Sequence, residues 1–226
     1  MDPRARLAAR NNADWCDLVC RTHGIDTAFD QDMWVAARRS PPMYPDAVTL
    51  REHLSASDVL PRIDNSRGCS IKDSFASVDL SHDGFRLLFA AEWIHRSPSR
   101  GRVKPLLSWS VVRTADELRV WAAAHGGGET FRPSLVDDPA VAVLAARDDD
   151  GMVAGAIANR SASVVGLSNL FLRETDPGRV WTEASDAACA QFPGLPLVGY
   201  EYGASLQLAH RSGFVSIGPL CVWVND

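Results

Sequence analysis

No stretch of this chain approaches the ~20 apolar residues of a membrane span, and no apolar segment follows its basic N-terminus, so neither a membrane partner nor a secretory signal is predicted. Positive charge is not in excess: the formal net charge of -5 argues against a nucleic-acid partner. Cysteine is sparse, with five residues and no CxxC pair, which favours reduced thiols in a cytoplasmic protein. Lysine occurs only twice in a chain rich in alanine, arginine and aspartate, a usage typical of a high-GC bacterial gene.

What the chain has is the composition of a folded protein. Its 226 residues, 46% of them hydrophobic and 23% charged, can bury one large core or two small ones. The segment Ser97–Lys104 (SPSRGRVK) is polar, basic and rich in serine, proline and glycine, which makes it the best linker candidate. We therefore expect an N-terminal α/β half over residues 1–104 and a second domain over residues 105–226.

The elements of the N-terminal half are predicted from local signals. Residues 9–24 show the apolar spacing of a helix, with Asn11 or Asn12 as its cap and Gly24 as its end. Residues 25–47 are expected to form loops. The remaining expected elements are a strand at Val48–Leu50, a short helix with a capping box at Ser55–Asp58, and two long strands, Cys69–Leu80 and Phe85–His95, joined as a hairpin by Ser81–Gly84.

After the expected linker the pattern starts again. It predicts a strand at Trp109–Arg113, a helix at Thr114–His125 with a capping box to Glu117, and a hairpin of Val141–Ala146 with Met152–Ala158. Strand, helix and hairpin therefore occur in both halves. This order is consistent with a tandem, pseudo-duplicated arrangement whose first copy is truncated, and equally with the common element order of α/β proteins.

The C-terminal part carries the most information. Its expected elements are a strand at Ser163–Leu172, a helix at Gly178–Phe192, a strand at Leu195–Glu201, a helix at Gly203–Ser212 and a strand at Val215–Val224. This order, with Gly213-Phe214 after the last helix, resembles the C-terminal half of the GNAT superfamily of N-acetyltransferases. The resemblance implies an α/β (α+β) fold with a mixed, mostly antiparallel sheet flanked by helices.

The turn that follows the first of these strands carries the cofactor in the family that the chain resembles. Its family pattern is Arg/Gln-x-x-Gly-x-Gly/Ala, and here the turn runs from Arg173 to Gly178 (RETDPG). The resemblance implies that the backbone of Asn169–Leu172, including Phe171 and Leu172, pairs with the pantetheine arm of acetyl-CoA or another acyl-CoA. It further implies that the phosphates meet Arg173, Gly178, Arg179 and Val180.

This turn departs from the family pattern at two positions. Asp176 replaces the middle glycine and adds negative charge where phosphates are expected; at ~4 Å and an effective dielectric constant of ~20, one like-charge pair costs about 4 kcal/mol. Pro177 removes one N–H donor. Arg179 is a cation that offsets part of this cost. The alternative interpretation is that Asp176 and Pro177 simply begin a helix as its N-cap and first residue.

The candidate acid and bases are less clearly marked. The family often has a tyrosine four residues before the glycine of Gly213-Phe214, and here that position is Ala209. Tyr200 or Tyr202, at the end of the expected strand Leu195–Glu201, is the candidate proton donor to the departing thiolate; packing at a strand end is the alternative. Glu201 is the first candidate for the general base, and Glu129 in the glycine-rich loop is the second.

A metal site is not expected. Cys16, Cys20 and His23 share one face of the first helix, but tetrahedral zinc needs a fourth ligand, and buried cysteines commonly act as small apolar residues.

Two main hypotheses of function follow. The first is an acyl-CoA-dependent N-acyltransferase in which a small-molecule or protein amine attacks the thioester directly. The second is a non-catalytic GNAT-like module that has lost acetyl-CoA binding and serves in binding or assembly, for example as a homodimer. An unrelated small-molecule-binding protein of α+β architecture is the third possibility.

Overall fold

The computed structural model describes residues 2–98, 105–149, 151–173 and 176–226. The chain forms two compact units: unit 1 comprises Met1–Trp93 and Ile217–Asp226, and unit 2 comprises Ile94–Ser216. The C-terminal residues thus belong with the N-terminal part of the chain, and the strands β5 (Phe85–Arg96) and β11 (Val215–Asn225) contribute to both units. Of the linker predicted at Ser97–Lys104, all but Ser97 and Pro98 lie outside the described residues.

Unit 1 is a mixed sheet with a helix on each face. Its sheet has the order β1-β2-β3-β4-β11-β5, with a parallel pair at β3 and β4 and antiparallel pairs at β1–β2, β2–β3 and β4–β11. The elements not yet given are α1 (Pro3–Thr22), β1 (Thr27–Phe29), β2 (Met33–Ala36), β3 (Ala47–Thr49), α2 (Ala56–Val59), the 3-10 helix η1 (Leu60–Arg62) and β4 (Ser70–Asp73).

Helix α1 begins earlier than the sequence pattern predicted. The side chain of Asp2 caps it by accepting a hydrogen bond from the N–H of Arg4 (2.9 Å), and Pro3 occupies the first turn, where a missing N–H costs little. Asn11, predicted as a possible cap, lies inside the helix and is buried. The predicted end is confirmed, since the helix stops before Gly24.

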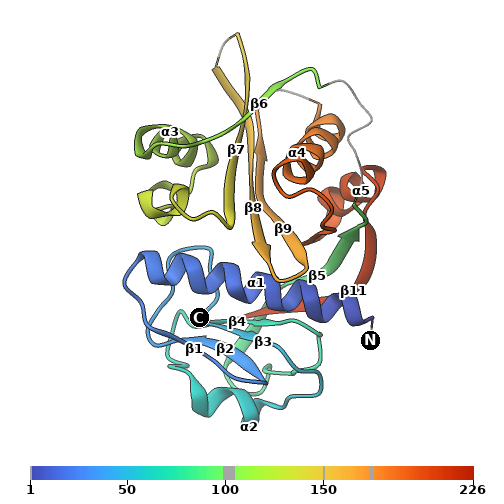
Figure 1. Ribbon diagram of the computed structural model, residues 1–226. Coiled ribbons are helices and arrows are strands. Elements are labelled where there is room, and N and C mark those ends of the chain that lie inside the picture. The colour runs from blue at the N-terminus through green and yellow to red at the C-terminus, as the bar shows by residue number, and fades with distance from the viewer. Residues whose placement is uncertain (1, 99–104, 150, 174–175) are drawn as a thin grey trace. The chain divides into compact units, whose positions relative to one another are not determined.

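The two faces of the unit 1 sheet bury different side chains. Helix α1 covers one face and α2 the other (Figure 1). Trp34 and Val48 pack with Cys16 and Cys20 of α1, whereas Val59 of α2 belongs to the cluster on the opposite face. The cysteines of α1 are thus core residues, as one interpretation of the sequence held. The pKa of the Cys16 thiol is raised to about 12, chiefly by burial, so it is not a nucleophile at neutral pH.

The hairpin predicted around Ser81–Gly84 is wrong. Strand β4 ends at Asp73, whose buried carboxylate accepts hydrogen bonds from the backbone N–H groups of Phe75 (3.2 Å), Ser77 (2.6 Å) and Val78 (2.7 Å). These bonds turn the chain out of the strand. As a result β4 pairs with β3 and β11, not with β5. The segment predicted as loop at residues 25–47 also contains β1 and β2.

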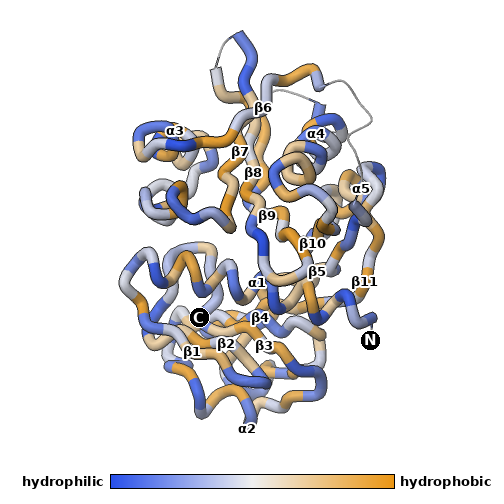
Figure 2. The backbone as a smooth tube through the Cα atoms, in the orientation of Figure 1, coloured by the Kyte–Doolittle hydropathy of each residue, from blue (hydrophilic) through white to orange (hydrophobic). Residues whose placement is uncertain are grey.

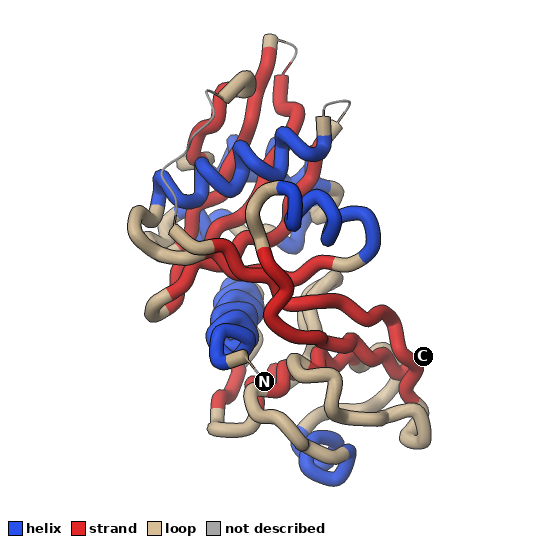
Figure 3. The backbone as a smooth tube through the Cα atoms, turned by 90° about the vertical axis from the view of Figure 1, so that its right-hand side faces the viewer, coloured by secondary structure: helices blue, strands red, loops and turns tan. Residues whose placement is uncertain are grey.

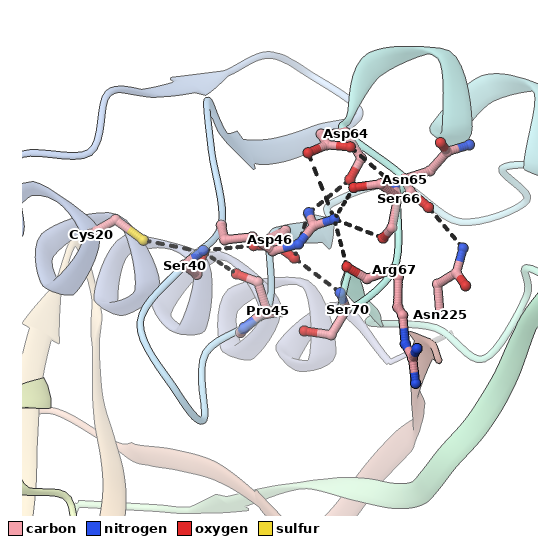
Figure 4. A network of polar contacts seen from close by, with 11 residues as sticks. Cys20, Ser40, Pro45, Asp46, Asp64, Asn65, Ser66, Arg67, Ser70 and Asn225 are labelled. Carbon is pink, nitrogen blue, oxygen red and sulfur yellow. Dashed lines mark hydrogen bonds and ion pairs between the residues drawn. The ribbon is translucent and has the colours of Figure 1, made fainter.

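A buried carboxylate ties the loops of unit 1 together. Asp46 accepts hydrogen bonds from the N–H groups of Ser40 (2.7 Å) and Ser70 (3.0 Å), as Figure 4 shows, and forms an ion pair with Arg39 (3.3 Å). Arg39 in turn donates to the carbonyl oxygen of Ser66 (2.7 Å). These contacts hold the loops around β3 and β4 in place.

Unit 2 contains the remaining elements. Its sheet has the order β10-β9-β8-β7-β6, with the end of β5 beside β10; β9 and β10 are parallel, and the β6–β7, β7–β8 and β8–β9 pairs are antiparallel. The elements are β6 (Ser108–Val111), α3 (Ala115–His125), η2 (Gly128–Thr130), η3 (Pro133–Val136), β7 (Val141–Asp148), β8 (Gly151–Ser161), β9 (Val164–Leu172), α4 (Pro177–Gln191), β10 (Leu197–Glu201) and α5 (Gly203–Arg211).

The predictions for unit 2 are largely confirmed. Thr114 caps α3 and forms the expected capping box with Glu117, and Gly126 ends the helix in a left-handed conformation. Strands β7 and β8 form the expected hairpin, in which Asp148 is paired with Gly151. The predicted fold class, a mixed and mostly antiparallel sheet flanked by helices, is also confirmed.

Helices cover both faces of the unit 2 sheet. Helices α4 and α5 pack on one face around Leu144, Leu197 and Trp181, and α3 lies on the other (Figures 1 and 3). Figure 2 shows hydrophobic residues along β7, which both layers bury. Among the described residues, no helix is long and apolar enough to cross a bilayer.

Candidate active site

The central irregularity of unit 2 is a β-bulge in β9. Gly155 of β8 is paired with Phe171, but Ile157 is paired with Ser168, so β9 advances three residues while β8 advances two. The extra residue lies at Asn169 and Leu170, and Asn169 has a φ of 53°, a left-handed conformation that asparagine tolerates better than most residues. The bulge bends β9 and re-aims its backbone groups just before the predicted cofactor turn.

The pairing of β9 with β10 ends close to this bulge. Leu197 is paired with Val165, and Val198 with Gly166. Beyond these residues no further pairs of the two strands are found in the part of the chain that the structure describes, although β9 continues to Leu172 and β10 to Glu201. The backbone of Asn169–Leu172 therefore has an edge that a ligand with amide groups can pair with, as in the addition of a strand to a sheet.

The side chains of this part of β9 point alternately to the two faces. Leu170 and Leu172 pack against the cluster of Ala146, Ala154 and Val180, whereas Phe171 packs edge-on against Trp121 of α3, with ring centroids 5.3 Å apart. Of the residues predicted to bind a cofactor, Phe171 and Leu172 thus have side chains engaged in packing. Only their backbone is suited to a ligand.

Glu201 ends β10 and is the candidate base with the more unusual environment. Its side chain is half-buried, and no hydrogen bond or ion pair of its carboxylate is found among the described residues. Burial raises the pKa of this carboxyl group to about 7. A carboxylate that exchanges its proton near neutral pH is suited to general base catalysis.

The other predicted acid and base residues have ordinary surroundings. Tyr202 is 55% exposed and immediately precedes α5, and Tyr200 is half-buried one residue before Glu201. Glu129 lies in η2 with a side chain that is 91% exposed, and it forms an ion pair with Arg132 (2.7 Å).

In the described part of the predicted phosphate turn, Asp176 binds backbone N–H groups of the helix that follows it. The Asp176 side chain caps α4 by accepting a hydrogen bond from the N–H of Gly178 (3.0 Å), and the carbonyl oxygen of Asp176 accepts one from Val180 (3.1 Å). Pro177, the first residue of the helix, has no N–H. The predicted role of Asp176 and Pro177 as N-cap and first residue is therefore confirmed. Glu174 and Thr175 lie outside the described residues.

Arg173 and Arg179, the two arginines predicted to meet the phosphates, differ in their interaction partners. Arg179 donates from Nε to Oε1 of Glu183 (2.7 Å), a carboxylate on the next turn of α4 that is only 4% exposed. Arg173 is exposed, and its guanidinium approaches the carbonyl oxygen of Ala124 at 3.5 Å. Only Arg173 is thus exposed and outside a buried ion pair.

Glu183 is a structural residue that the sequence analysis did not single out. Besides Arg179, it accepts hydrogen bonds from the N–H groups of Leu106 (2.9 Å) and Leu107 (3.3 Å) and from Nε1 of Trp109 (3.0 Å). Burial alone raises the pKa of this carboxyl group, but the four donors outweigh it and hold the pKa below its usual range. Glu183 thus fastens the segment before β6 onto α4.

An aromatic cluster on the α3 face was also missed. Trp121 and His125 stack with centroids 5.2 Å apart, and both meet Phe131 and Phe171 edge-on. Burial lowers the pKa of His125, so its imidazole is neutral at pH 7. The four-residue spacing of Trp121 and His125 on one helix was the available signal, but it did not reveal Phe171 as their partner.

The residues of this site suit the pantetheine arm of an acyl-CoA molecule, but not its diphosphate. The unpaired edge of β9 beside the bulge suits the pantetheine arm, whose amides need strand-like partners. The described residues of the turn do not suit the diphosphate, because the Asp176 carboxylate holds the N–H of Gly178 and Arg179 is paired with Glu183. Among the described residues, no cluster of histidine, cysteine, aspartate or glutamate able to hold a metal ion is found.

Comparison with known proteins agrees with this architecture. No family model matches the sequence, and no curated protein matches it. Among solved structures, a GCN5-related N-acetyltransferase from Kribbella flavida is similar with a TM-score of 0.65 and 12% identity, over 97% of this chain and 95% of that one. A GCN5-related N-acetyltransferase-like protein from Streptococcus suis has a TM-score of 0.55 and 15% identity, over 98% of both chains. A conserved protein of unknown function from Staphylococcus epidermidis has a TM-score of 0.62 and 12% identity, over 89% of this chain and 94% of that one.

Proposed function

We propose that this chain, which has a GNAT-like fold, is an N-acyltransferase that moves an acyl group from a thioester to an amine. The observation that carries this proposal is the pairing of β9 with β10, which ends after Val198 just before the bulge at Asn169. The edge freed in this way can hold the donor's amide-containing arm in an extended conformation. The resemblance implies acetyl-CoA or another acyl-CoA as the donor, and a small molecule or a protein carrying an amine as the acceptor.

Glu201 is the proposed general base. An amine is protonated in water and must lose a proton before or during attack on a carbonyl carbon. In the proposed step the amine nitrogen forms a bond to the thioester carbonyl carbon, the carbon–sulfur bond breaks, and the amine proton passes to Glu201 directly or through water. The thiolate that leaves then takes up a proton, and Tyr200 and Tyr202 are the candidate donors by position in the chain.

The activity is tested by incubating the protein with acetyl-CoA at millimolar concentration and a panel of primary amines, with mass-spectrometric detection of the amide. We expect an amide product whose rate rises with pH through about pH 7, because Glu201 must be ionised to accept a proton. Glu201→Gln should lower kcat by ~10²-fold or more with little change in KM, the loss typical of a general base. Asp116→Asn, an 85% exposed carboxylate on α3, is the matched control.

Glu129→Gln separates the two candidate bases. A loss of activity in Glu129→Gln but not in Glu201→Gln would identify Glu129, in the loop after α3, as the general base. The absence of any amide from the whole panel, with the protein shown to be folded, would refute the proposed activity.

A second candidate function is favoured by the N-cap at Asp176. The contact of Asp176 with Gly178 is the arrangement expected of a GNAT-like domain that has lost its cofactor and serves as a binding or assembly module, including as a homodimer. Sedimentation over a range of concentrations tests self-association. A dimer without amide formation would favour this function over catalysis.

A further inference from the structure

The acyl donor is the part of the proposed reaction on which the structure bears most directly. We propose that the donor is an acyl-pantetheine thioester recognised without the 3′-phospho-ADP portion of CoA, presented either free or on a carrier protein. This inference rests on the proposed acyltransferase function. It concerns only which part of the donor supplies the binding energy.

The first argument is that the N-terminus of α4 already holds a carboxylate of this chain. A helix N-terminus attracts anions because its first N–H groups lack partners and its dipole is positive there. Here Gly178 donates to the Asp176 carboxylate at 3.0 Å, Val180 donates to the Asp176 carbonyl oxygen at 3.1 Å, and Pro177 has no N–H to donate. A carboxylate of this chain thus occupies the place where a phosphate would bind, and it repels one that approaches.

The second argument is that the nearest cation on the helix is committed elsewhere. Arg179 pairs at 2.7 Å with Glu183, which is buried and holds the N–H groups of Leu106 and Leu107. Moving Arg179 to a phosphate would leave a buried carboxylate without its charged partner, which is strongly unfavourable. Arg173 remains as an exposed cation, and exposed ion pairs contribute little affinity.

The third argument is that the edge of β9 suited to the uncharged arm is present. The bulge at Asn169 and the end of β9–β10 pairing at Val198 leave an extended backbone edge on β9. At Gly199 an added Cβ would lie 2.8 Å from the carbonyl oxygen of Leu167, so the absence of a side chain there is required for the close approach of the two strands. Pantetheine carries two amides and no charge, and this edge offers it the backbone partners that it needs.

The test compares donors with the intact protein. Acetyl-CoA, S-acetyl-4′-phosphopantetheine and S-acetyl-pantetheine are each titrated against one amine that gives product, and kcat/KM is measured for each. We expect the three values to agree within a few-fold. A value for acetyl-CoA that is 30-fold or more above that for S-acetyl-pantetheine would overturn this inference and leave the acyltransferase function standing. No product from any donor would overturn both.

A carrier-bound donor distinguishes the two sources of the arm. If the kcat/KM for an acetylated acyl-carrier protein is tenfold or more above that for S-acetyl-pantetheine, the donor is a carrier-bound thioester. Equal kcat/KM values indicate that the donor is a free thioester.

A variant of the turn provides an independent readout. Asp176→Asn keeps a capping oxygen but removes the charge, and we expect it to tighten CoA binding by roughly tenfold in calorimetric titration at low salt while leaving pantetheine binding unchanged. The control is Asp116→Asn, which removes an equivalent charge from the first turn of α3. Equal tightening by both variants, or none by Asp176→Asn, would contradict the role given to Asp176.

Discussion

Glu201→Gln should make the protein more stable while it slows the proposed transfer. The folded protein raises the pKa of Glu201 from 4.5 to about 7 because the carboxylate loses water and gains no partner. At ~1.36 kcal/mol per pH unit this difference corresponds to about 3 kcal/mol against the ionised form. The side chain is only half-buried, so we expect solvent to screen part of it and leave about 1–2 kcal/mol.

The sign of this effect depends on pH. Below pH 4.5 the carboxyl group is protonated in the folded and unfolded states, so ionisation imposes no penalty. As the pH rises from 4.5 to about 7 the unfolded chain releases the proton first, and the stability of the folded protein falls. Above pH 7 the folded protein bears the full free-energy cost of the desolvated, ionised carboxylate. Glutamine carries no charge, so the variant avoids this cost at every pH.

The assay is urea denaturation of wild type and Glu201→Gln at pH 4 and pH 8, with tryptophan fluorescence as the probe. We expect the variant to gain about 1–2 kcal/mol at pH 8 and nothing at pH 4. Glu129→Gln makes the same chemical change at a side chain that is 91% exposed, and it should stay within about 0.5 kcal/mol of wild type at both pH values. A variant that is destabilised at pH 8, or equally stabilised at both pH values, would refute the desolvation argument.

Two further predictions concern packing in unit 2. Glu183→Gln should lower the free energy of unfolding by about 2–4 kcal/mol at pH 7, because the buried group accepts four hydrogen bonds and neutralises an arginine; an unchanged urea midpoint would show that these bonds contribute little. Gly155→Ala should cost about 1–3 kcal/mol in the same measurement, because the added Cβ would lie 2.4 Å from Nε1 of Trp121 and 2.9 Å from the carbonyl oxygen of Leu144. A Tm equal to that of wild type would show that this crowding is relieved without cost.

The elements of unit 2 were predictable because their signals are local. The capping box of Thr114 with Glu117, the turn between Asp148 and Gly151, and the N-cap at Asp176 each lie within four residues of sequence. Local signals decide where elements begin and end. They do not decide which strands pair, and for that reason the hairpin predicted in unit 1 was wrong.

The wrong hairpin in unit 1 shows what local patterns leave out. The Asp-Gly turn at Asp83-Gly84 is a strong hairpin signal, but hairpin formation also requires that the preceding strand continue to the turn. Asp73 prevents this by drawing three backbone N–H groups onto its buried carboxylate. The strand that pairs with β4 instead is β11, about 150 residues further along the chain, and no short window of sequence contains that information.

The candidate site was predictable in part for the same reason. The order of elements predicted β9, β10 and the start of α4 close to where the structure has them, and Glu201 was selected from its place at a strand end. The bulge at Asn169 was not predicted, because it depends on the register between β8 and β9. The commitment of Arg179 to Glu183 was not predicted either. Its four-residue spacing is visible in the sequence, but the burial that makes the pair hard to break is not.

The first turn of α4 shows how a ligand-binding feature and a stabilising feature exclude each other. A glycine-rich turn leaves N–H groups without partners until an anion arrives, and such groups are unfavourable in the free protein when they are shielded from water. Asp176 satisfies one of them permanently, a capping contact worth about 1 kcal/mol. Any anion that binds there must first displace this contact and then tolerate the carboxylate nearby. In the proposed reaction the acyl donor therefore draws its affinity from the backbone edge of β9, which requires no charge.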